Sequence, residues 1–94
     1  MNTEKEKKAS MKSRLSGMLE LPKEIMLNLP LVTVIGSEEV TIENYKSVIE
    51  YSQTRIRVNT SSGIFKIEGK NLTLKQITSE AVVITGIIGV MAYI

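Results

Sequence analysis

The chain has 94 residues and a formal net charge of +2, a size that fits one domain burying roughly 65% of the surface exposed by its unfolded chain. It contains no cysteine and no histidine, which excludes disulfides, zinc–thiolate sites and a histidine-based catalytic triad. We therefore expect a protein that is not an enzyme, with no cofactor, no metal and no small-molecule substrate.

The first 20 residues are predicted to form a basic flexible arm and a short helix. Residues 1–14 carry five basic and two acidic side chains, whereas residues 15–94 carry seven and eight. Such an arm is more often a solvated tail than an anion-binding segment, although an anionic membrane surface would suit it. Because no apolar stretch precedes Leu15, we expect no signal peptide and a cytoplasmic protein.

Within the arm, apolar side chains recur at helical spacing after Ser10, a residue suited to capping a helix start. They are Met11, Leu15, Met18 and Leu19. The predicted helix is short and contains Gly17, so it needs a surface to pack on. We expect that surface to be the helix's own domain, with a membrane or a partner protein as the alternative.

Residues 21–94 are predicted to form one β domain. The segment 21–30 is bracketed by Pro22 and Pro30, which favours an edge strand or a bridging arm. From Leu31 onward, runs of four to seven alternating apolar residues are separated by short Gly, Asn, Ser or charged turns. We expect an all-β fold, a small antiparallel β-sandwich or rolled meander of about eight short strands. A short β-solenoid is the alternative, although its Gly spacing would be irregular.

Alternation within the runs predicts which side chains face the core. The expected inward set is Val40, Ile42, Ile56, Val58, Leu72 and Leu74. Turns are expected at the Gly or Asn positions 36–37, 43–44, 62–63 and 69–71. Their lengths leave no room for the helical crossovers of a parallel sheet.

The last fourteen residues carry no charge and are apolar on both faces, unlike the earlier runs. They are too few for a transmembrane helix, and their Val, Ile and Thr content favours strands. One interpretation is a pair of central strands covered on both sides; the other is a terminal hairpin that pairs with another chain. The partner-binding residues predicted in this segment are Ile87, Ile88, Val90, Met91 and Tyr93. Met11, Leu15, Met18 and Leu19 of the predicted helix complete the set of residues predicted to bind a partner.

Basic residues on neighbouring predicted strands alternate with acidic ones, Arg55 and Arg57 with Glu50 for example. This pattern favours cross-strand ion pairs over a nucleic-acid site. The few scattered aromatic residues do not form a base-stacking platform, so we expect no nucleic-acid partner.

The segments LPKEIMLNLP, IGSEEVTIEN, IRVNTSSG and IEGKNLTLKQI, in this order and spacing, resemble the YabP/YqfC family of sporulation proteins, and its YqfC branch most. The resemblance covers about residues 19–90. It implies a protein made in the mother cell during endospore formation, working beside a membrane protein in spore coat or cortex development, with no enzymatic activity or cofactor. The sequence departs from the family at GIIGVMAYI, which is more apolar than the family's usual last strand.

Two functions are compatible with these features. The first is a non-catalytic interaction module that docks on a membrane partner in the mother cell, at the membrane surrounding the forespore. The second is a self-assembling structural protein, a homo-oligomer or polymer built through the C-terminal strands.

Overall fold

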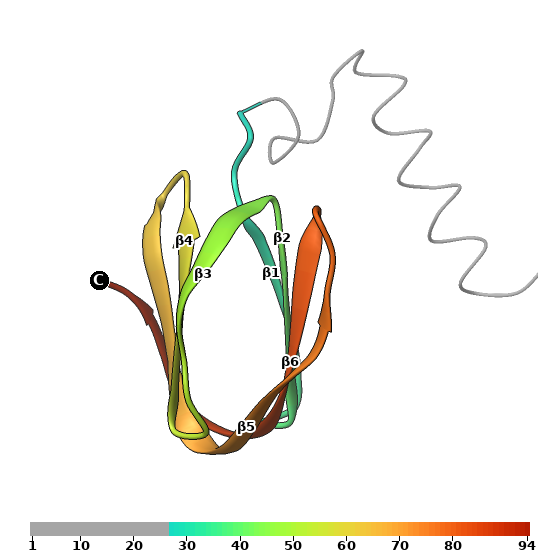
Figure 1. Cartoon of the computed structure of the whole chain (residues 1–94), viewed down its shortest axis with the longest axis vertical. Coiled ribbons are helices and arrows are strands. Elements are labelled where there is room, and N and C mark those ends of the chain that lie inside the picture. The colour runs from blue at the N-terminus through green and yellow to red at the C-terminus, as the bar shows by residue number, and fades with distance from the viewer. Residues whose placement is uncertain (1–26) are drawn as a thin grey trace, which may run out of the picture.

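The computed structural model describes residues 27–94, which contain strands only (Figure 1). The strands are β1 (Leu31–Ile35), β2 (Glu39–Glu43), β3 (Tyr45–Tyr51), β4 (Arg55–Thr60), β5 (Gly63–Ile77) and β6 (Ala81–Tyr93). Across residues 27–94 there is no helix long and apolar enough to cross a membrane. The helix predicted between residues 10 and 19 lies outside the described part of the chain.

All six strands belong to one antiparallel sheet with the order β1-β2-β6-β5-β4-β3. Strands β3 to β6 follow one another as a meander, whereas the chain passes from β2 to the far edge of the sheet to begin β3. The all-β, antiparallel prediction is therefore confirmed. The solenoid alternative is wrong, because every pair of neighbouring strands runs in opposite directions.

Strands β5 and β6 are long, and both curve around the bottom of the molecule in Figure 1, which folds the single sheet over on itself. One layer contains β1, β2, the first half of β6 and the second half of β5. The other contains β3, β4, the first half of β5 and the second half of β6. The result is a sandwich-like roll whose two layers share their longest strands.

Gly69 marks the bend in β5, where the chain runs against β6 without space for a side chain. A Cβ atom at Gly69 would lie 2.0 Å from the carbonyl oxygen of Ile87. The β3–β4 turn holds the bend from the other side: Gly69 N–H donates to the Thr54 carbonyl (3.1 Å), and Leu72 N–H donates to the Gln53 carbonyl (2.9 Å).

The bend in β6 is built in the same way around Gly86. This glycine has a φ of 143°, and its Cβ would lie 2.8 Å from the Asn71 carbonyl oxygen. Here the β1–β2 turn supplies the acceptors: Gly86 N–H donates to the Glu38 carbonyl (3.1 Å) and Ile88 N–H to the Ser37 carbonyl (2.9 Å). Each bend is thus clamped by the turn of a neighbouring hairpin.

These bends explain why the predicted number of strands is wrong. The sequence suggested a turn at residues 69–71, and Asn71 does adopt a left-handed φ of 54°. Instead of closing a hairpin, this segment shifts the register of pairing between β5 and β6 within continuous strands. The two runs on either side of Gly86 likewise form one strand, so the predicted terminal hairpin is the single strand β6.

The core lies between the two layers and consists of apolar side chains from β2, β4, β5 and β6. They are Val40, Ile42, Ile56, Val58, Phe65, Ile67, Leu72, Val82, Ile84 and Ile88. Five of the six residues predicted to face inward belong to this set, and the sixth, Leu74, is half-buried and packs against it. Alternation within each strand therefore predicted the buried face.

One open side of the roll is closed where β3 meets the end of β5. Asn44 N–H donates to the Glu80 carbonyl (2.9 Å), and the Tyr45 hydroxyl donates to the Thr78 carbonyl. These bonds join the beginning of β3 to the β5–β6 turn, so the two layers are tied together along this side.

The chain enters β1 through a turn at residues 27–28 rather than through a strand. The Asn28 carbonyl accepts a hydrogen bond from Ser61 Oγ (2.7 Å), and the Leu29 carbonyl accepts one from Asn44 Nδ2 (2.9 Å). Of the predicted segment 21–30, the described residues thus form a bridge and not an edge strand, and the remainder lies outside the described residues.

A Gly69→Ala substitution is expected to lower the free energy of unfolding by more than about 3 kcal/mol, because the added methyl group meets backbone and not a flexible side chain. Gly89→Ala is the matched control, since its Cβ would meet only an ordinary 3.5 Å contact with the Glu68 carbonyl oxygen. Urea unfolding followed by circular dichroism measures both. Equal stability of the two variants would contradict the close approach at Gly69.

Candidate interaction surface

The second half of β6 is an open edge of the sheet. Strand β2 pairs with β6 only from Ala81 to Thr85, whereas β5 accompanies it as far as Tyr93. The β1–β2 turn occupies the vacated side as far as Ile88. Within residues 27–94, no strand lies along this side of β6 beyond Gly89, so its backbone groups are available for pairing with another strand.

Two side chains of this half-strand extend the inner face of their layer beyond the closed core. Met91 lies opposite Ile67, and Tyr93 lies opposite Phe65, whose ring it meets edge-on with 5.0 Å between centroids. Ile67 and Phe65 are buried, whereas Met91 and Tyr93 are 36% and 46% exposed. The apolar interior therefore continues to the surface at this edge.

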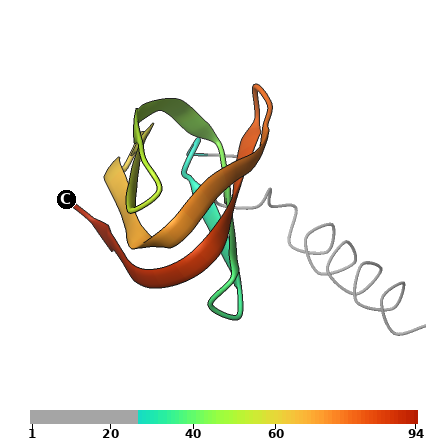
Figure 2. The ribbon, with the colours of Figure 1, turned by 60° about the horizontal axis from the view of Figure 1, so that its bottom comes forward.

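Further exposed apolar side chains surround this edge. We call the exposed set on β6 and at the C-terminus the terminal apolar surface: Ile87, Val90, Met91, Tyr93 and Ile94. Figure 2 shows the second half of β6 and the β1–β2 turn on the same side of the molecule, and exposed Val34 and Ile35 end β1 there. Apolar residues from both layers thus gather on one side.

The structure separates the residues predicted to bind a partner. Ile87, Val90, Met91 and Tyr93 are exposed on β6, whereas Ile88 belongs to the buried core. The predicted residues of the helix, Met11, Leu15, Met18 and Leu19, lie outside the described part of the chain. Sequence reasoning missed Val34, Ile35 and Ile94; the uncharged run LVTVI was the available signal for the first two.

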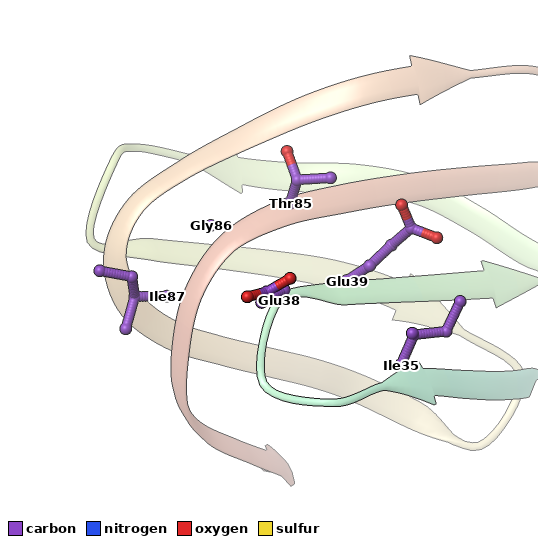
Figure 3. A pocket seen from close by; sticks show the side chains of 6 residues that line it. All are labelled: Ile35, Glu38, Glu39, Thr85, Gly86 and Ile87. Atoms are coloured by element: carbon purple, nitrogen blue, oxygen red, sulfur yellow. The ribbon is translucent and has the colours of Figure 1, made fainter.

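An open hollow lies at the bend of β6, beside the terminal apolar surface (Figure 3). Its lining residues are Ile35, Glu38, Glu39, Thr85, Gly86 and Ile87. The Glu39 carboxylate also contacts Lys75 Nζ at 3.4 Å. In the described part of the chain, no group of three acidic, histidine or cysteine side chains is arranged to hold a metal ion. The hollow therefore places the carboxylates of Glu38 and Glu39 beside Ile35 and Ile87, without a metal-binding set.

Comparison with known proteins agrees with the sequence resemblance. Residues 28–94 match the sequence model of the YabP family. The chain belongs to the YabP family. It is also 33% identical over 89 residues to the uncharacterized protein YqfC of Bacillus subtilis (strain 168), covering 95% of this chain and 96% of that one. No solved structure matches the chain.

In this YabP-family protein, the main charged cluster lies on β3 and β4, away from the open edge of β6 in the strand order. Glu50 Oε1 contacts Arg57 Nε at 2.6 Å and Arg55 Nε at 3.1 Å. Lys66 and Glu68 form another pair at 3.4 Å on β5. The predicted ion pairing between basic and acidic residues is thus confirmed.

The hydrogen bond from Arg57 is the main cause that lowers the pKa of the Glu50 carboxyl below its ordinary value, with the charge of Arg55 acting in the same direction and partial desolvation opposing both. Because the pKa of this carboxyl is lower in the folded chain than in the unfolded chain, its ionised form stabilises the folded state at pH values above the unfolded-state pKa. This contribution is lost as the pH falls through the folded-state pKa. Because these side chains are partly exposed, the contribution is small and salt-dependent.

Glu50→Gln is accordingly expected to lower the urea midpoint at pH 7. The difference from the natural protein should begin to shrink as the pH falls through the ordinary glutamate pKa of about 4.3, and it should vanish only below the lowered folded-state pKa of Glu50. The control is Glu80→Gln, since the Glu80 carboxylate makes no ion pair with any residue between 27 and 94. A deficit of Glu50→Gln that persists unchanged in acid would refute the ionic origin of the effect.

Proposed function

We propose that this YabP-family protein is a non-enzymatic interaction module of sporulation, acting in the mother cell beside a membrane protein during spore coat or cortex development. The sporulation setting is supported by the resemblance in sequence to the YabP/YqfC family. The site would be the cytoplasmic face of the membrane that surrounds the forespore. The observation that carries the docking role is the open edge of β6 with its terminal apolar surface.

An exposed strand edge with apolar neighbours is a suitable docking site for physical reasons. Its free N–H and C=O groups can pair with an added strand, and exposed apolar side chains gain free energy when a partner removes them from water. Small soluble domains usually protect such edges with charges or prolines. The segment from Ala81 to Ile94 contains neither, which supports a covered state of this surface.

The self-assembling structural protein remains the second candidate. The uncharged edge favours it, because two copies could meet there without bringing like charges together. In this case the protein would act as a building element and the membrane partner would be dispensable for its assembly.

The docking role is tested in a sporulating bacterium whose own copy is replaced by fluorescently tagged variants. Val90→Asp places a charge on the terminal apolar surface at a 49% exposed position, so the fold should tolerate it while recruitment to the forespore membrane is lost. Ile49→Asp is the matched control, because Ile49 is 45% exposed on β3 at the other edge of the sheet. Normal recruitment of a folded Val90→Asp variant would exclude this surface as the docking site.

The arm is tested separately by deleting residues 1–19 from the tagged protein. If the basic arm and its predicted helix contribute to docking, the deletion should reduce membrane recruitment although residues 27–94 are intact. Circular dichroism of the purified variant checks that the β domain is preserved. Unchanged recruitment would show that docking does not need the arm.

A further inference from the structure

We propose that the open edge of β6 joins two copies of this chain by antiparallel pairing centred on Met91, so that their sheets become continuous. This inference rests on the second candidate function, self-assembly through the C-terminal strands, and deepens it by naming the paired residues and their register. It draws on backbone direction, the distribution of charge over the sheet edges and the position of one glycine.

The backbone direction follows from the last hydrogen bond between β6 and β5. Ile94 N–H donates to the Ile64 carbonyl (2.9 Å), so residue 94 faces β5. Alternate residues of an antiparallel strand face the same neighbour, which directs the N–H and C=O groups of Met91 and Tyr93 away from β5. The β1–β2 turn blocks the edge only as far as Ile88. Among residues 27–94, nothing therefore prevents the outward-facing backbone groups of Met91 and Tyr93 from accepting an antiparallel strand along residues 89–93.

A twofold axis through Met91 brings this short segment into register with itself. Met91 then lies opposite Met91 of the partner subunit, and Tyr93 lies opposite Gly89 of the partner subunit. No charged side chain occurs on the strand, so the pairing brings no like charges together. Each copy contributes β6, β5, β4 and β3 to the joined layer, which becomes one sheet across the pair.

The other edges of the sheet are less suited to such pairing. Strand β3 carries Lys46 and Glu50, and charged residues on an edge strand oppose edge-to-edge association. Strand β1 directly follows Pro30, and a proline beside an edge strand hinders the addition of another strand. The charges on β3 and the proline before β1 thus direct self-association to β6.

Gly89 supplies a further argument, because the fold of one copy does not require a glycine there. Its φ is not left-handed, and a Cβ would find only a 3.5 Å contact, in contrast to the close approaches at Gly69 and Gly86. The register between β5 and β6 also leaves Gly89 without a pairing partner. Opposite Tyr93 of the partner subunit, the missing side chain leaves space for the aromatic ring to lie across the strand, an arrangement that covers a glycine from water.

Sedimentation of the purified full-length chain tests the pairing. At about 100 µM we expect a dimer, whereas Met91→Lys and Met91→Glu each sediment as monomers because the twofold axis places two like charges opposite each other. An equal mixture of the two variants should recover the dimer, since Lys and Glu then face each other. Ile49→Lys, with the same charge added on β3, should remain dimeric.

A second variant avoids dependence on a charge at the edge. The chain has no cysteine, so Met91→Cys introduces one thiol, and Cα atoms about 5.5 Å apart across the axis permit a disulfide. Mild oxidation should give a covalent dimer of Met91→Cys but not of Ile49→Cys. Failure to cross-link, while the variant still sediments as a dimer, would overturn the proposed register.

Other occupants of the edge give different results. If the natural protein stays monomeric over the whole concentration range, the pairing is overturned. If residues 1–26 of the same chain cover the edge in that monomer, the protein should become dimeric when those residues are deleted. A dimer unaffected by Met91→Lys would place the contact elsewhere. A monomer with normal membrane recruitment refutes only the pairing, whereas a dimer in which Val90→Asp is recruited normally refutes only the docking role of the surface.

Discussion

The close approach of β5 and β6 backbones at their bends is the constraint on which the rest of the structure depends. Gly69 and Gly86 leave no space for a side chain, and this allows two long strands to turn together from one layer into the other. A sheet of six strands can then enclose a core on its own, without help from a helix in residues 27–94. The close approach at these two glycines therefore underlies both the topology of the sheet and the stability of its core.

The same bends create the candidate interaction surface. Strand β2 follows β6 only until the bend at Gly86, and beyond it β6 enters the other layer as an edge. Met91 and Tyr93, which lie on β6 beyond the part that β2 accompanies, thereby come to lie at the rim of the core. The structure thus divides the C-terminal sequence, since the first half of β6 lies between β2 and β5 and its second half pairs only with β5 within residues 27–94.

The sequence predicted well the features that depend on neighbouring residues, and poorly those that depend on pairing with strands far along the chain. Alternation within a strand depends on a residue's own neighbours, which is why Val40, Ile42 and Ile56 were correctly placed in the core. Whether residues 69–71 close a hairpin or bend a strand depends on pairing with β6, which no local pattern reveals. Ile88 was misplaced because the last fourteen residues are apolar on both faces, so their composition does not show which side chains face the core. The exposure of Val34 and Ile35 follows from the order of the strands, which places β1 at an edge.

The clamping of each bend by a neighbouring turn has a consequence for the order of folding. Hairpins β1–β2 and β3–β4 join residues close in sequence, whereas β2 must wait for β6, about forty residues later, to complete its pairing. The carbonyls at Ser37, Glu38, Gln53 and Thr54 are already positioned when these hairpins form. The early hairpins can then act as templates that select where the late strands bend, which lowers the entropic barrier to closing the roll.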